Sequence, residues 1–144
     1  MNRLSEILAE KGEVVLRIEA DSSVLNAVRR MVDFNVGSLL VTDDGRDIGI
    51  VTERDYLRRV TLEGRDERET PVREIISSPL VVATRQTTVT ECMALMTDRR
   101  IRHVPVVGED GGVVGLVSIG DLVKFTSRQQ SFELKYLRDY INAH

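Results

Sequence analysis

One stretch of this chain occurs twice, and that repetition limits the folds open to it more than any other feature. The first copy runs from Val36 to Asp55, and the second runs from Ile101 to Asp121. Each copy ends in a glycine, a hydroxyl residue and an aspartate at one spacing: Gly49, Thr52 and Asp55, then Gly115, Ser118 and Asp121. Internal repeats fold into matching units, so we expect two units of the same topology.

Both copies predict the element order β-α-β-β-α. Apolar runs bounded by turn residues predict strands, and Ser, Thr and Asp residues ahead of apolar stripes predict helix starts. The strands of the first copy are predicted at 14–18, 39–41 and 48–51, with helices after the caps at 21–23 and at Thr52. Those of the second copy are predicted at 80–83, 104–107 and 113–117, with helices after the caps at 87–88 and at Ser118.

The remaining segments complete an α+β fold with two repeats; the family resemblance given below implies that these repeats are related by pseudo-twofold symmetry. Leu4, Ile7 and Leu8 have helical spacing, and Lys11 and Gly12 end that helix. Nothing interrupts the helical pattern from Asp121 to about Ile141, which predicts one long C-terminal helix. The predicted boundaries are 1–63 for the N-terminal segment and first repeat, 64–71 for a polar linker, 72–125 for the second repeat, and 126–144 for the helical extension.

Composition narrows the class of protein. The chain has 144 residues, a net charge of −3 and an ordinary share of apolar residues, which fits a globular domain and disfavours a nucleic-acid binder. No apolar run approaches the roughly 20 residues of a membrane span, and the N-terminus lacks the apolar region of a secretory signal. The single cysteine, Cys92, cannot form an intramolecular disulfide, which fits a cytoplasmic protein.

The repeated motif has the chemistry of a nucleotide site. A Thr or Ser hydroxyl at a helix start, together with the free N–H groups there, can donate to a phosphate. An aspartate three residues later can accept the two hydroxyls of a ribose, and the preceding apolar pairs, 50–51 and 116–117, can hold a purine ring. The alternative is that Thr52 and Ser118 are plain N-caps, with Asp55 and Asp121 favoured by the helix dipole.

The motif pair resembles the tandem cystathionine-β-synthase (CBS) domains, also called a Bateman module. Residues 51–59, residues 63–65 and residues 96–106, which contain Arg-His-Val-Pro-Val, are similar to the small stand-alone CBS-pair proteins of bacteria and plant organelles. The resemblance covers residues 4–125. It implies an adenine-containing ligand: AMP, ADP, ATP, NAD or S-adenosylmethionine.

By resemblance, Arg102 and His103 contact the phosphate, and Arg54 assists from the other repeat. The first copy has Gly37 and Ser38 where the second has these two residues, so two identical sites are not expected. The arginines and a cleft poor in acidic residues favour AMP or NAD over the sulfonium ligand. The predicted nucleotide-binding residues are Asp121, Ser118, Arg102, His103, Thr52, Arg54, Asp55, Leu116, Val117 and Ile50.

No catalytic or metal-binding constellation is predicted, because Cys92 lies on an apolar helix stripe and the two histidines have no zinc spacing. We therefore expect a non-catalytic sensor that binds an adenine nucleotide, needs no metal and signals to an unidentified partner. The alternative is a protein-interaction module that regulates a partner such as thioredoxin, with the nucleotide as modulator. A homodimer is also expected, through some of four apolar positions: Tyr56, Leu57, Met93 and Met96.

Overall fold

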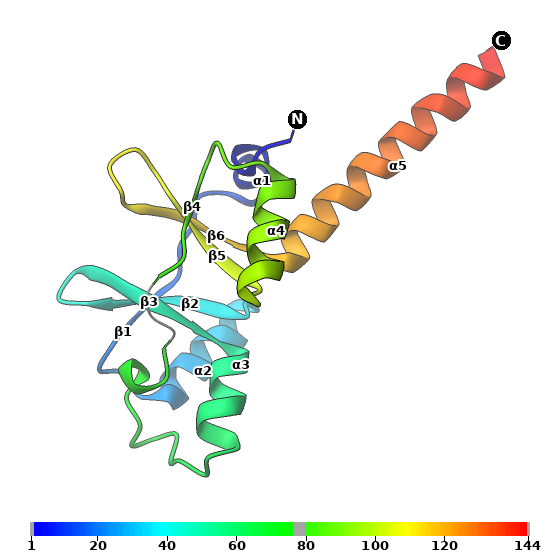
Figure 1. The fold of residues 1–144 in the computed structure, drawn as a ribbon. Helices are drawn as coiled ribbons and strands as arrows, with labels where there is room; N and C mark the ends of the chain where they lie inside the picture. The colour runs from blue at the N-terminus through cyan, green and yellow to red at the C-terminus, as the bar shows by residue number, and fades with distance from the viewer. Residues whose placement is uncertain (1, 77–79, 144) are drawn as a thin grey trace.

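Two three-stranded sheets of one topology form the centre of the computed structural model, which describes residues 2–76 and 80–143. In the first sheet, β1 (Arg17–Glu19) pairs parallel with β2 (Ser38–Asp43), which pairs antiparallel with β3 (Arg46–Thr52). In the second sheet, β4 (Ala83–Thr84), β5 (His103–Val107) and β6 (Val113–Ser118) pair in the same way. Figure 1 shows the two sheets one above the other. The predicted α+β fold with two β-α-β-β-α repeats is confirmed.

The two sheets agree in detail as well as in order. The middle strand of each sheet carries a β-bulge at the corresponding place, between Val41 and Thr42 and between Val106 and Val107. The register of the parallel pair also corresponds, with Ile18 opposite Val41 and Ala83 opposite Val106. Because a one-residue slip would turn every side chain to the other face, this agreement places the same face of both sheets against a core.

Polar caps start the helices between the strands. Ser23 accepts from the Asn26 N–H at 3.1 Å ahead of α2 (Val24–Phe34), and Thr88 accepts from the Glu91 N–H at 3.0 Å ahead of α4 (Val89–Arg99). Both helices end at a left-handed residue, Asn35 at φ 53° and Arg100 at φ 56°. The second helix of the first repeat, α3 (Glu53–Tyr56), is a single turn that continues into the π-helical turn Leu57–Thr61.

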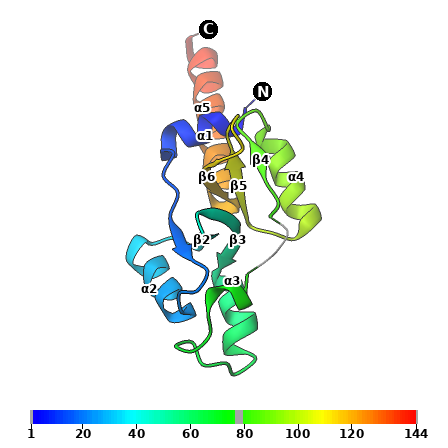
Figure 2. The same ribbon diagram turned by 90° about the vertical axis from the view of Figure 1, so that its left-hand side faces the viewer.

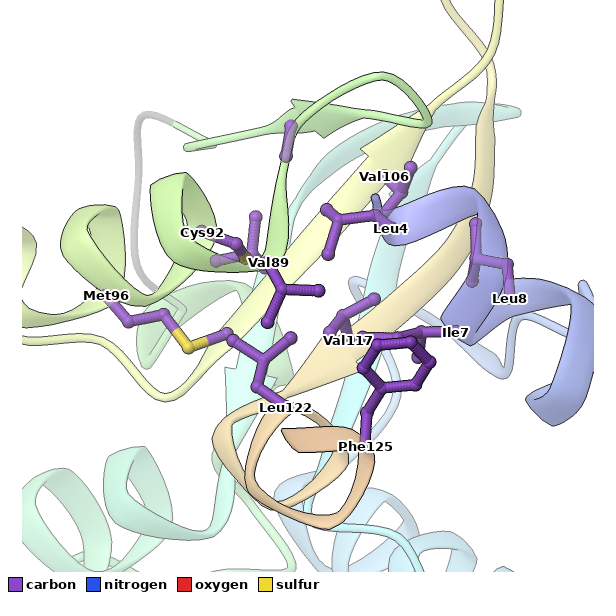
Figure 3. Packing of buried hydrophobic residues seen from close by; sticks show 12 residues of the cluster. Leu4, Ile7, Leu8, Val89, Cys92, Met96, Val106, Val117, Leu122 and Phe125 are labelled. Atoms are coloured by element: carbon purple, nitrogen blue, oxygen red, sulfur yellow. The ribbon is translucent and has the colours of Figure 1, made fainter. Parts of the chain in front are cut away.

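Each repeat has its own apolar core, and each core contains a segment that precedes the other repeat in the chain. The helix α1 (Leu4–Lys11) buries Leu4, Ile7 and Leu8 in the core of the second repeat. Figure 3 shows these side chains meeting Val117, Leu122 and Phe125. Reciprocally, Val72 and Ile75, from the 3₁₀ turn Val72–Glu74 and its end, lie in the core of the first repeat.

Main-chain hydrogen bonds fix this exchange in both directions. Leu4 N–H donates to the Thr87 carbonyl at 2.9 Å, and Val72 N–H donates to the Ser22 carbonyl at 2.8 Å. One bond returns across each junction, from the Val89 N–H to the Asn2 carbonyl and from the Val24 N–H to the Thr70 carbonyl, both at 2.9 Å. In Figures 1 and 2, α1 accordingly lies beside the sheet of the second repeat. Residues 1–63 therefore do not pack as one body, because α1 lies in the core of the second repeat. The predicted domain boundaries along the chain stay a prediction.

Several local predictions were wrong. The first strand covers Arg17–Glu19 instead of 14–18, because the parallel pairing with β2 reaches only three residues. The fourth strand is Ala83–Thr84 instead of 80–83; residue 79 and its two predecessors lie outside the described residues. The spacing of the apolar residues in α2 predicts that Val32 faces inward, but it is 72% exposed. Met96, one of the four residues of which some were expected at a dimer interface, is buried in the second core.

The long C-terminal helix was predicted correctly. It forms α5 (Ile119–Ala143), whose first turns contribute Leu122 and Phe125 to the second core. Beyond them it leaves the body of the molecule, as Figure 1 shows. Residues 130–142 are all exposed, so this part does not pack back onto the chain's own body.

Candidate nucleotide site

A pocket of about 570 Å³ lies between the two repeats. It is bounded by five stretches of chain: the segment before β1, the start of β2, the start of α3, the start of β5, and the β6–α5 junction. The residues that line it are Lys11, Gly12, Val14, Leu16, Asn35, Val36, Gly37, Ser38, Glu53, Arg102, His103, Leu116, Ser118, Ile119, Gly120 and Asp121. The walls therefore come from both repeats and from the exchanged N-terminal segment.

Two hydrogen bonds with Ser118, at the start of α5, hold Asp121 in place. Its Oδ2 atom accepts from the Ser118 N–H at 2.9 Å, and its own N–H donates to Ser118 Oγ at 3.1 Å. The predicted capping arrangement is thus present, and the same carboxylate also faces the pocket. The capping and binding interpretations of this residue are compatible.

Lys11, at the end of α1, completes the surroundings of Asp121. Its ammonium group donates to Asp121 Oδ2 at 2.7 Å and to the Leu116 carbonyl at 2.6 Å. Gly12 follows at φ 92°, a conformation that a side chain would strain. Partial burial raises the pKa of Asp121, but the Lys11 and Ser118 hydrogen bonds outweigh it and lower that pKa below its ordinary value. The aspartate is therefore charged at neutral pH.

His103 and Glu53 both lie close to Gly37 in this pocket. A Cβ atom on Gly37 would lie 2.7 Å from Glu53 Oε1 and 3.3 Å from His103 Cε1, so glycine permits this approach. Burial is the main cause that lowers the pKa of His103, and Lys11 adds to it. The nearby carboxylates of Glu53, Asp121 and Asp55 act in the opposite direction without reversing the shift. The imidazole is consequently neutral near pH 7.

Five of the ten predicted site residues meet in this pocket. Asp121, Ser118 and Leu116 come from the second motif, and Arg102 and His103 come from the start of β5. The Arg102 carbonyl accepts from the Ile119 N–H at 2.8 Å, which joins the strand start to the start of α5. The structure thus brings together Arg102, His103 and Ser118, which sequence analysis assigned to the phosphate, and Asp121, which it assigned to the ribose.

The other five do not line this pocket. Val117 is buried in the second core, since alternate strand residues face opposite sides. Thr52 and Asp55 form their own capping box, with the Thr52 N–H donating to Asp55 Oδ2 at 2.9 Å. Ile50 is half-buried on β3, and Arg54 is exposed on α3.

Two charged residues of the pocket lining, Lys11 and Glu53, were not predicted from the sequence. Lys11 was interpreted only as a helix end, and nothing local indicates that α1 crosses to the other repeat. Glu53 follows Thr52 in the first motif, whereas Ile119 follows Ser118 in the second. This difference between the two copies was the sequence signal that could have identified Glu53. With Glu53 and Asp121 both present, the pocket is not poor in acidic groups, and charge alone does not disfavour a sulfonium ligand.

Other chemistry receives no support from the described residues. Cys92 is fully buried, and that burial raises the pKa of its thiol to about 11, which makes it a poor nucleophile. Within residues 2–76 and 80–143, no group of three His, Cys, Asp or Glu side chains could hold a metal ion. None of the helices in these ranges is both long and apolar enough to cross a bilayer.

Comparisons with known proteins agree with this architecture. The CBS domain model matches residues 12–61 and again residues 72–128. The mitochondrial CBS domain-containing protein CBSX3 of Arabidopsis thaliana is 40% identical, over 97% of this chain and 72% of the relative. A putative signal-transduction protein with CBS domains from Burkholderia ambifaria has a TM-score of 0.83 at 38% identity, covering 87% of this chain and 93% of that chain.

A further solved structure shows what one such protein binds. A CBS domain protein from Pyrobaculum aerophilum, complexed with AMP, has a TM-score of 0.73 at 28% identity and covers 83% of this chain and 88% of its own. The family match extends over both halves of the chain, and a relative that is 40% identical matches 97% of it. This protein therefore belongs to the CBS-domain family, in which it is a tandem pair of CBS domains.

Proposed function

We propose that this chain is a non-catalytic regulatory module that binds an adenine nucleotide of the AMP, ATP or NAD class in the pocket between its repeats. The observation that carries the proposal is the placement of Asp121, which is charged and faces a pocket lined by both repeats. Pockets that bind small ligands usually enclose about 300–1,000 Å³, a range that includes this one. The AMP complex of the Pyrobaculum aerophilum relative supports the choice of ligand.

Each part of the nucleotide has a matching group in the pocket. Asp121 accepts the ribose hydroxyls through Oδ1, to which none of the described residues donates a hydrogen bond. Ser118 and Arg102 donate to the phosphate, with His103 beside them. Arginine suits this role because its planar fork can donate two parallel bonds. Val14, Leu16 and Leu116 supply apolar surface for the purine.

Lys11 links the ligand to the N-terminal helix. Its ammonium group already contacts the aspartate that receives the ribose, so it lies within reach of the same hydroxyls. Because α1 packs in the core of the second repeat, any movement of Lys11 on binding is passed to that core. The ligand state thereby reaches parts of the molecule outside the pocket.

A surface groove next to the pocket supports an interaction role. This groove, of about 360 Å³, is lined by Val28, Met31, Val32, Asn35, Val36, Glu53, Tyr56 and Leu57. Asn35, Val36 and Glu53 also line the nucleotide pocket, so occupancy of one can influence the other. We propose that the groove is a homodimer contact. The alternative, a regulated protein partner such as thioredoxin with the nucleotide as modulator, uses the same surface.

Individual residues also support proposals about the cellular compartment of the protein and about its lack of catalytic activity. We propose a cytoplasmic protein, supported by the single buried cysteine, although the name of the Arabidopsis relative places that protein in mitochondria. We also propose that it is no enzyme and needs no metal. Asp121 and Ser118 are engaged in capping each other, which supports a binding role for both residues.

A nucleotide panel tests the proposal. Purified protein is heated with AMP, ADP, ATP, NAD and S-adenosylmethionine in turn, with guanosine monophosphate as the mismatched control. A ligand present at one hundred times its dissociation constant stabilises the folded state by about 2.7 kcal/mol, which raises the melting temperature by several degrees. Mass spectrometry of the protein as purified identifies any nucleotide carried over. If no adenine compound shifts the melting temperature and none co-purifies, the sensor function is wrong.

A further inference from the structure

The far half of α5 has a large apolar surface that its own chain does not cover. Beyond Phe125 the helix extends away from the body in both views (Figures 1 and 2). Six large apolar or aromatic side chains on this part are between 54% and 70% exposed: Phe132, Leu134, Tyr136, Leu137, Tyr140 and Ile141. An exposed apolar surface of this kind usually marks an interaction site.

Part of this surface follows the spacing of a coiled coil. Starting at Val123, alternate steps of four and three residues reach Ser127, Gln130, Leu134, Leu137 and Ile141. These are successive d and a positions of a heptad, and we call the six residues the α5 seam. The seam avoids Leu122 and Phe125, which are buried in the chain's own core. It is therefore a face that remains open after the chain has folded.

The charges beside the seam match a second copy of the same helix. Glu133 is at a g position and Arg138 is at the following e position, five residues later. In a parallel pair of identical helices, g of one helix lies against the following e of the other, so Glu133 of each copy faces Arg138 of its partner. An antiparallel pair would place g against g and e against e, on opposite edges of the seam. The charge pattern thus selects the parallel arrangement.

We propose that the α5 seam pairs with the α5 seam of a second copy of this chain, as a short parallel coiled coil. Ser127 and Gln130 put two polar layers near the base, which weakens the pairing and fixes its register. Val123, 50% exposed at the base, continues the seam toward the body. The inference rests on the homodimer of the proposed function and adds to it a second contact, distant from the groove on α2 and α3.

Site-directed crosslinking of the full chain tests the geometry. Gln130→Cys places a thiol in the seam, where two copies in parallel register meet at the same residue. Gln129→Cys, one position outside the seam, is the matched control, and Cys92 is buried and stays silent. Under mild oxidation at micromolar concentration, the Gln130→Cys protein is expected to form a covalent dimer much faster than the control. If the two variants crosslinked at the same rate, or if neither crosslinked, the proposed pairing of the α5 seam would be wrong.

Charge exchange tests the partner without altering the apolar layers. Glu133→Arg and Arg138→Glu each place like charges together and should raise the dissociation constant of the dimer in analytical ultracentrifugation. The double variant restores opposite charges and should return the constant to the wild-type value. Because positions five apart in one helix do not face each other, such rescue has to act between copies. If both single variants dissociate like wild type, the parallel pairing is wrong.

The outcomes separate this inference from the functions proposed above. A monomeric wild-type protein overturns both the homodimer and the seam, whereas nucleotide binding is measured independently. A dimeric wild-type protein without selective crosslinking overturns the seam alone and leaves the groove as the contact. Circular dichroism checks that each variant keeps its helix content. If α5 becomes protected only on adding phospholipid vesicles, the surface is a membrane contact and the inference is wrong.

Discussion

Two residues that lie far apart in the sequence, Lys11 and Ser118, hold the side chain of Asp121. Ser118 fixes it through the helix start, and Lys11 contacts it across the junction between the repeats. The equivalent aspartate of the first repeat, Asp55, makes the same capping box with Thr52 but does not line the described pocket. Two chemically equal residues therefore differ in surroundings, and this difference can be used to separate stability from binding.

Arg102 is expected to recognise the phosphate. It is exposed and lines the pocket, and a hydrogen bond to a charged group contributes about 1.5–3 kcal/mol. Arg102→Ala should therefore weaken AMP binding by about tenfold to a hundredfold while leaving adenosine binding nearly unchanged. Isothermal titration calorimetry of AMP and adenosine with wild type and with Arg102→Ala completes a thermodynamic cycle, which gives the coupling between Arg102 and the phosphate. Arg99→Ala, exposed in the last turn of α4, is the control. If Arg102→Ala lowered the affinities for AMP and adenosine equally, the assignment of Arg102 to the phosphate would be wrong.

His103 should give binding a dependence on pH. Its pKa is lowered in the folded protein, so the unfolded chain binds more protons between this value and the ordinary pKa of 6.5. The contribution to stability is complete above about pH 6.5 and is lost as the pH falls through the lowered pKa. An anionic phosphate nearby favours the imidazolium and raises that pKa again.

AMP binding near pH 6 should consequently take up a fraction of a proton. Calorimetry in two buffers of different ionisation enthalpy measures that uptake, and His103→Gln should abolish it. Proton uptake of the same size in the His103→Gln protein would assign it to another group. Because burial lowers the pKa of His103, the uptake should be measured below its ordinary pKa of 6.5.

At the scale of elements, local signals predicted most of the fold. Glycine and aspartate turns, Ser and Thr caps and strand alternation act between residues close in the chain, so hairpins and helix starts were placed correctly. The exchange of α1 and of the turn Val72–Glu74 between repeats was not predicted, because an apolar stripe does not specify which core it enters. Lys11 was missed for the same reason. The pocket half formed by the β6–α5 junction was predicted, and the half formed by α1 was not.

The exchanged helix should matter for stability and for binding together. Leu8 is buried, and its Cδ2 atom approaches the backbone at Gly115 so closely that a Cβ there would lie at 2.5 Å. Leu8→Ala should lower the free energy of unfolding by about 2–5 kcal/mol in urea denaturation. Because α1 carries Lys11, AMP affinity should fall as well. Leu62→Ala, at an 80% exposed position, should change stability by less than about 0.5 kcal/mol. An unchanged stability of Leu8→Ala would contradict the exchange.

At the scale of the whole molecule, the pocket, the groove and α5 form one connected arrangement. The pocket lies between the repeats, the groove shares three lining residues with it, and α5 begins at the motif that holds Asp121. A ligand that joins the two repeats can therefore act on both surfaces that we assign to a second copy. This arrangement follows from the duplication, which the sequence revealed, and from the unequal side chains in the two copies, which decide where the pocket forms.

Calorimetric titration of AMP into wild type, Asp121→Ala and Asp55→Ala tests the central claim most directly. Both variants lose a helix-capping carboxylate and should each cost about 0.5–2 kcal/mol of stability. Only Asp121→Ala removes the ribose acceptor, so its affinity should fall at least tenfold while Asp55→Ala keeps the affinity of wild type. Equal AMP affinity in wild type and Asp121→Ala, or a loss confined to Asp55→Ala, would contradict the assignment of the ligand to the pocket between the repeats.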